Sequence, residues 1–206
     1  MKTTLIRLFA VFPLIFMLNA TGFAFEELGK IEMEPASLSD PIAPGTKTKW
    51  LKNGEEYWTE TLSVDGDVVS GIDSTGCEYT YLWSTWAPSL SWKNCNGNTG
   101  THKITRTKGS PWPMKVKTKF SFNFRGSSDQ GQTWKGYRKC KVKSAVRIRI
   151  PAGEFDTYKI KCSVDWETRT YWYSPEMGRS IASERKHKRN KSRNYFNEMV
   201  SVENPS

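Results

Sequence analysis

The stretch RKCKVKSAVRIRI, residues Arg138–Ile150, decides the fold. After Arg138 its even positions, apart from Ser144, are apolar or cysteine, and its odd positions, apart from Ala145, are lysine or arginine. Successive side chains of a β-strand point to opposite faces, so this alternation is typical of a half-buried strand. The stretch therefore predicts a strand with an apolar face toward the core and a basic face toward solvent.

The chain that follows predicts a hairpin. Pro151-Ala152-Gly153 suits a type I turn that closes on a left-handed glycine, which would place Ile150 opposite Glu154. Alternation resumes over residues 157–173. Cys140 and Cys162 then share a face and lie nearly opposite each other, and a small bulge would bring them together as a disulfide.

The rest of the chain keeps the same period of two from about residue 46, and no segment sustains a period of 3.6. Asn53-Gly54 and Asp65-Gly66 are short hairpin signals. We expect one antiparallel all-β domain over residues 46–206, a single curved sheet of roughly ten strands that is barrel-like or a sandwich. The remaining expected strands are 46–51, 57–64, 68–73, 78–83, 90–94, 102–107, 115–125, 179–185 and 194–202.

The first 24 residues are typical of a secretory signal peptide. Basic residues precede the apolar run Leu8–Leu18, and Gly22 and Ala24 form a small-x-small cleavage site before Phe25. The run is short for a membrane span, and no second run of spanning length follows. We expect an exported protein, periplasmic or secreted, with no transmembrane span. Residues 25–45 are acidic and contain three prolines, which predicts an extended lead-in.

Four cysteines follow the signal peptide: Cys77, Cys95, Cys140 and Cys162. An even number in an exported chain indicates two disulfides, and three pairings are possible. We favour Cys77–Cys95 and Cys140–Cys162, because each pair brackets a predicted hairpin. The wide spacing disfavours a four-cysteine zinc site, so no metal is expected.

Charge is strongly segregated along the chain. The net charge is +10, yet residues 25–78 hold 4 basic and 12 acidic side chains, whereas residues 79–206 hold 25 basic and 9 acidic ones. A basic face in an exported protein points to a polyanion. The alternatives are a solvated face that protects sheet edges, or an acidic first third that covers part of the basic sheet. The candidate anion-binding residues are Lys115, Lys117, Lys119, Lys139, Lys141, Lys143, Arg147, Arg149, Arg185, Lys186, Lys188 and Arg189.

Nine tryptophans are many for 206 residues. Exposed tryptophan beside lysine can stack on sugars or bases, although packing in the core and at corners is the commoner use in β domains. The stacking candidates are Trp83, Trp86, Trp92 and Trp112.

Catalytic and cofactor motifs are missing from the sequence. It lacks a Gly-x-Ser-x-Gly elbow and a phosphate-binding glycine loop, and it has only two histidines, His102 and His187. Carboxylate pairs include Glu154/Asp156, Asp65/Asp67 and Asp165/Glu167; the turn at Gly66 explains Asp65/Asp67, and cross-strand pairing with basic neighbours explains Asp165/Glu167. We therefore assign no catalytic residue and no cofactor.

Two motifs resemble those of a known family. Ile150–Tyr158, IPAGEFDTY, resembles a V/I-P-A-G-x-F-x-x-Y/L element, and Tyr171–Arg179, YWYSPEMGR, resembles a W-Y-x-P-x-x-G element. Their succession is similar to a family of exported bacterial β-proteins of unknown function. The resemblance implies a curved antiparallel sheet and an envelope location, and it implies no catalytic residue.

These observations favour a non-enzymatic exported β-domain that binds an anionic envelope component through its basic sheet face. The expected partners are an anionic glycan, a lipid head group or an acidic protein. Nucleic acid is disfavoured because the chain has no base-reading motif. One alternative is a glycan hydrolase that uses carboxylates in a tryptophan-lined cleft. The other is a structural envelope protein whose strands pair with a partner.

Overall fold

The computed structural model describes residues 25–205, so the predicted signal peptide lies outside the described residues. The described chain contains thirteen β-strands and one short 3-10 helix, Lys191–Arg193. Within it, no helix is long and apolar enough to cross a membrane. The strands are β1 Glu26–Lys30, β2 Lys47–Lys52, β3 Glu55–Asp65, β4 Val68–Asp73, β5 Glu78–Leu82, β6 Ser91–Cys95, β7 Asn98–Lys108, β8 Lys119–Ser128, β9 Thr133–Ile150, β10 Gly153–Ser163, β11 Glu167–Ser174, β12 Arg179–His187 and β13 Tyr195–Glu203.

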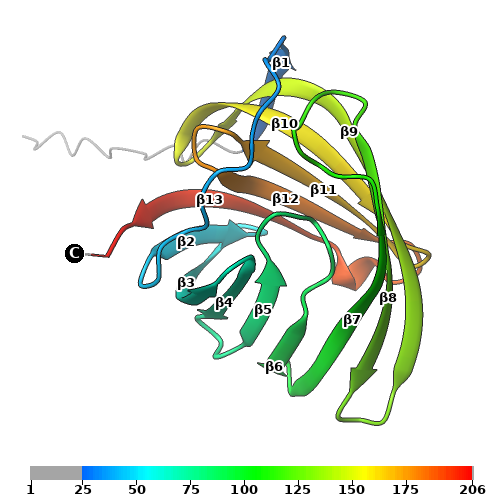
Figure 1. Cartoon of the computed structure of the whole chain (residues 1–206). Helices are drawn as coiled ribbons and strands as arrows, with labels where there is room; N and C mark the ends of the chain where they lie inside the picture. The colour runs from blue at the N-terminus through cyan, green and yellow to red at the C-terminus, as the bar shows by residue number, and fades with distance from the viewer. Residues whose placement is uncertain (1–24, 206) are drawn as a thin grey trace, which may run out of the picture.

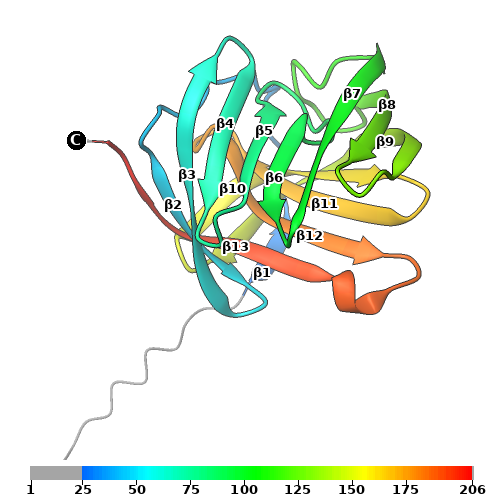
Figure 2. The same ribbon diagram turned by 90° about the horizontal axis from the view of Figure 1, so that it is seen from below.

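All thirteen strands form one antiparallel sheet that closes on itself. The strand order is β1-β9-β10-β11-β12-β13-β2-β3-β4-β5-β6-β7-β8, and β8 also pairs with β9. Strands β2 to β13 therefore make a closed barrel, and β1 is added at the far end of β9 (Figure 1). Seen from below, β3 to β6 run across the direction of β10 to β12 (Figure 2). The predicted all-β curved sheet is confirmed as a closed barrel, with slightly more strands than expected.

The β9–β10 hairpin carries the predicted disulfide. Ile150 pairs with Gly153 rather than with Glu154, so the connection is one residue tighter than expected. A register shift between Lys159 and Ile160 then brings Cys140 directly opposite Cys162, and the two are bonded. Cys77 and Cys95 form the second disulfide, so both predicted pairs are confirmed.

The same shift changes which way the side chains of β9 point. The bulge places one extra residue of β9 at Lys143, and a one-residue slip turns every later side chain to the other face. Cys140 and Val142 consequently belong to one hydrophobic cluster, and Val146 and Ile148 belong to another. The expectation that even positions share one face along the whole of β9 is therefore wrong beyond the bulge.

Two predicted strand boundaries also differ from the structure. Residues 115–118 form a turn, closed by the Thr118 N–H donating to the Lys115 carbonyl, and β8 begins only at Lys119. The predicted strand 157–173 is two strands, because Val164–Trp166 turns the chain from β10 into β11. The Asn53-Gly54 signal is confirmed: both residues have positive φ, as a type I′ turn between β2 and β3 requires.

Candidate functional site

A lysine patch lies on the outer face of the barrel where β8, β9 and β10 meet. The patch includes four of the predicted anion-binding residues and adds two that the sequence analysis missed. Among residues 25–205, none of its members makes an ion pair with a carboxylate, and together they line a shallow hollow beside Tyr137. The lysine patch consists of Lys108, Lys119, Lys139, Lys141, Lys143 and Lys161.

The strand register brings these cations into rows. Lys141 faces Lys119 on one side and Lys161 on the other, so three like charges lie directly opposite one another across three strands. Such pairs have Cβ atoms about 5 Å apart and destabilise a sheet. In the next row, Ser121 lies between Lys108 and Lys139. These like charges do not stabilise the sheet, so the stability of the fold does not explain why they are concentrated here.

Arg147 and Arg149 do not belong to this patch, because the bulge turns them to the opposite face of the hairpin. Arg147 donates two hydrogen bonds to Asp156, at 2.6 and 3.0 Å. Arg149 donates to Glu154 and to Glu26 of β1. The acidic lead-in therefore neutralises part of the basic sequence and leaves the lysine patch uncovered.

The other candidates are dispersed. Lys115 and Lys117 lie in the turn before β8, and Lys188 and Arg189 are exposed after β12. Lys186 pairs with Glu184 at 2.7 Å. Arg185, by contrast, reaches the buried Glu167 and donates to it at 2.7 Å.

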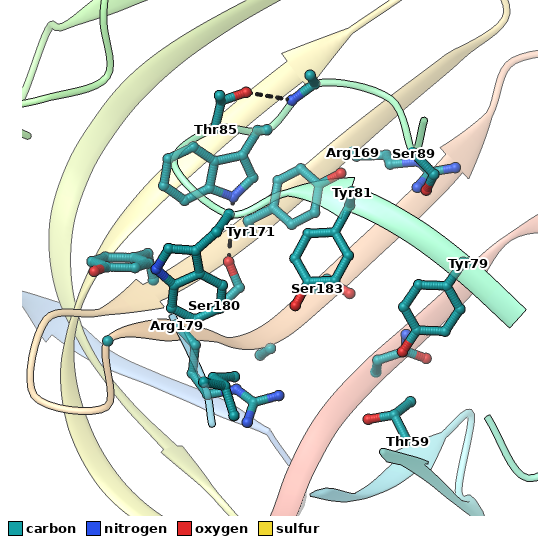
Figure 3. Close-up of a pocket in the computed structure, with 18 of the residues that line it drawn as sticks. Thr59, Tyr79, Tyr81, Thr85, Ser89, Arg169, Tyr171, Arg179, Ser180 and Ser183 are labelled. Atoms are coloured by element: carbon teal, nitrogen blue, oxygen red, sulfur yellow. Dashed lines mark hydrogen bonds between the residues drawn. The ribbon is translucent and has the colours of Figure 1, made fainter. Parts of the chain in front are cut away.

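A cavity of about 340 Å³ opens between the facing halves of the barrel (Figure 3). Three of the four predicted stacking residues, Trp83, Trp86 and Trp112, line it, together with Trp50. The indole N–H groups bond to the protein: that of Trp83 donates to the Ser39 carbonyl, and that of Trp112 to the Ser84 carbonyl. The polar lining comes from hydroxyl and amide side chains: Tyr57, Thr59, Tyr79, Tyr81, Thr85, Ser89, Tyr171, Tyr173, Ser180, Ser183 and Asn197.

Three arginines that the sequence analysis missed also line this cavity: Arg138, Arg169 and Arg179. Glu167, 3% exposed, accepts a hydrogen bond from Arg169 at 2.6 Å and lies 3.9 Å from Arg138. Although burial acts to raise the pKa of Glu167, the charges of its arginine neighbours outweigh burial and lower it. Glu167 is therefore ionised and balances part of the arginine charge.

Trp92 lies elsewhere, in an aromatic cluster near the ends of β6 to β9. Its ring packs 4.9 Å from His102 and 6.0 Å from Trp134. The missing Cβ of Gly100 leaves room for the ring, because an added Cβ would lie 2.2 Å from it. Trp92 thus packs against its neighbours and does not face the cavity.

The carboxylate pairs noted in the sequence do not face each other across this cavity. Glu154 and Asp156 bond arginines on the β9–β10 hairpin, and Asp67 accepts hydrogen bonds from Ser84. Among the described residues, no carboxylate is part of the cavity lining. The arrangement needed for two-carboxylate glycoside hydrolysis is not formed by these pairs.

No family model and no curated protein matches the chain. Its structure is similar to that of the hypothetical lipoprotein YmcC from Escherichia coli K12, with a TM-score of 0.51, 11% sequence identity, and coverage of 82% of this chain and 91% of that one. It is also similar to a protein from Bacteroides fragilis described as exported and YmcC-like in fold, with a TM-score of 0.41, 10% identity, and coverage of 82% and 100%. The likeness to YmcC shows a shared fold.

The first 24 residues of the sequence predict export. The disulfides point the same way, since two such bonds persist in an oxidising compartment outside the cytosol. The chain is an exported β-barrel protein.

Proposed function

We propose that this exported protein binds an anionic envelope glycan through the lysine patch. The observation that carries the proposal is the contrast between the two ends of the β9–β10 hairpin. At the tip, Arg147 and Arg149 each have carboxylate partners. At the other end, the row Lys119, Lys141 and Lys161 has none among the described residues.

A repeating polyanion suits this surface better than a single small anion. Neighbouring strands lie about 4.8 Å apart, so the row presents ammonium groups at short, regular intervals. Each lysine ammonium is a compact point charge on a flexible stem and can follow the phosphate or carboxylate groups of a chain. Tyr137, 43% exposed beside Lys139, adds an aromatic face on which a sugar ring can pack.

The test compares two triple variants with the same change in net charge. K119Q/K141Q/K161Q removes the central row of the lysine patch. K47Q/K49Q/K93Q removes lysines that are already paired, with Glu60, Glu56 and Glu78. The purified, oxidised proteins are titrated with polygalacturonate at rising salt, with neutral dextran as the polymer control.

We expect the patch variant to bind polygalacturonate about tenfold more weakly at low salt, and the paired-lysine variant to bind like the native protein. Equal weakening of both would show that net charge alone drives binding and would overturn the proposal. Vesicles that contain phosphatidylglycerol form a separate arm. Patch-dependent binding to the vesicles without binding to the polymer would replace the glycan with a lipid head group.

A further inference from the structure

The barrel interior holds more positive than negative charge. Arg138, Arg169 and Arg185 share the single carboxylate of Glu167. Arg179, on the opposite side of the cavity lining, has no carboxylate contact within the described chain. Arg179 is only partly exposed, and a cation with restricted access to water and no counter-charge is costly to the fold, so a ligand anion would explain its position.

The contacts of Arg179 leave part of its guanidinium unused. One Nη donates to the Thr48 hydroxyl at 2.9 Å, and the group lies over the Trp50 ring at 5.6 Å. Its Nε is buried and has no hydrogen-bond partner among the described residues. Burial lowers the pKa of Arg179, which reflects how poorly its charge is compensated. A buried N–H donor without an acceptor is rare in folded proteins. A bound ligand would supply the missing acceptor.

The tyrosines near Arg179 cannot supply the missing negative charge. Tyr79 and Tyr81 lie on β5 and contribute hydroxyl groups to the same cavity (Figure 3). Burial raises the pKa of both hydroxyls above its ordinary value, so they stay protonated and neutral. They can donate or accept hydrogen bonds, but they cannot neutralise a guanidinium.

The other residues that line the cavity indicate which chemical groups the ligand has besides its anion. Because the indole N–H groups of Trp83 and Trp112 are occupied by backbone carbonyls, these rings contribute aromatic surface rather than donors, and the Trp112 ring also packs against Trp86 and Tyr173. The hydroxyl groups of Thr59, Ser183 and the tyrosines line the same cavity (Figure 3). Aromatic surface together with hydroxyl groups matches a sugar, whose C–H face is apolar and whose edge is a circle of hydroxyl groups.

Size and access are consistent with such a ligand. A volume of about 340 Å³ is at the small end of the usual range for small-molecule sites, roughly 300–1,000 Å³. Leu38, which is part of the lining, is 43% exposed, so the cavity reaches the surface beside it. The space admits one or two sugar rings and not a polymer.

We propose that the barrel interior is a binding site for an acidic sugar of one or two rings, whose carboxylate or phosphate group bonds to Arg179. Arginine presents a planar fork of donors that fits these anions. The sugar ring would pack on the tryptophan faces and exchange hydrogen bonds with the surrounding hydroxyl groups. The inference is separate from the lysine patch, because it rests on different residues on the other side of the barrel wall.

The test follows tryptophan fluorescence, since four tryptophans line the cavity, while the native protein is titrated with glucuronic acid or glucose 6-phosphate. Glucose and inorganic phosphate are the controls for the ring and for the charge alone. We expect saturable binding of at least one acidic sugar, about tenfold tighter than either control. Equal binding of glucose, or binding of benzoate in preference to both acidic sugars, would overturn the assignment.

Arg179→Met separates a ligand contact from a structural role. It keeps an apolar stem and removes the unpaired charge, so the free protein should unfold at an equal or higher temperature while acidic-sugar binding is lost. Arg147→Met, at an exposed pair with Asp156, is the matched control and should bind normally.

Native-like binding by Arg179→Met would overturn the proposal. If that variant fails to fold, Arg179→Lys is used, because it keeps the charge and loses the fork, and we expect weaker binding. Sugar binding that is lost in K119Q/K141Q/K161Q and kept in Arg179→Met would assign the ligand to the lysine patch instead.

Discussion

Substituting Glu167 by glutamine tests the charge network inside the barrel. Glutamine keeps the volume of the side chain and one acceptor oxygen, but it leaves Arg138, Arg169 and Arg185 without their shared carboxylate. Two charge-assisted hydrogen bonds, at 2.6 and 2.7 Å, lose the ionised acceptor. Breaking a buried ion pair from one side destabilises a protein by about 3–5 kcal/mol.

For a domain of this size, that loss corresponds to a fall in Tm of about 6–20 °C. The assay is urea denaturation near neutral pH, with Tm measured in parallel. Asp156→Asn serves as the control: it also removes an arginine partner, but in an exposed pair that contributes little to stability.

The pH dependence of stability tests independently whether ionised Glu167 stabilises the fold. Because the pKa of Glu167 is lower in the folded protein than its ordinary value of 4.5, ionisation stabilises the fold above that pH. The contribution disappears as the pH falls through the lowered pKa, so native protein and Glu167→Gln should converge in acid. If Glu167→Gln lost no more stability than Asp156→Asn, or if the gap persisted in strong acid, the shared-carboxylate reasoning would be refuted.

Two further predictions concern stability. Burial lowers the pKa of His102 below 6.5, so near that pH the unfolded chain binds more protons at this residue than the folded protein does. The free energy of unfolding should therefore fall as the pH drops below 6.5, and His102→Gln should flatten this dependence. An unchanged slope of the free energy of unfolding against pH would show that another group is responsible. The disulfide Cys140–Cys162 spans 22 residues, so Cys140→Ala/Cys162→Ala should lower the free energy of unfolding by about 3 kcal/mol, measured by urea denaturation. A loss below about 1 kcal/mol would contradict a large contribution from loop closure.

The sequence predicted the β9–β10 hairpin and its disulfide because both depend on local alternation and on the parity of Cys140 and Cys162. The offset between the two cysteines predicted a small bulge but not its position, although the alternation lapses at Ser144 and Ala145, directly after the extra residue Lys143. The face of every later residue depends on that single slip. Arg147 and Arg149 were grouped with the lysines for this reason.

The interior arginines were missed although a signal for one of them was present. Arg138 shares parity with Cys140, so the alternation itself places it on the core face. The cavity could not be predicted, because Arg179 and Tyr79 come from strands brought face to face only when the sheet closes. Barrel closure depends on the long-range pairing of β13 with β2, about 150 residues apart in the chain, which no local pattern encodes.

Closure of the sheet also decides how copies of this protein can associate. Strands β2 to β13 are hydrogen-bonded on both sides, so of the described strands only β1 has an unpaired edge. That edge is five exposed residues long, carries two glutamates and is interrupted by a register shift. Short, charged, irregular edges are poor templates for further strands. The molecule is thereby protected against growing into fibres, and a structural role based on strand exchange would have to start at β1.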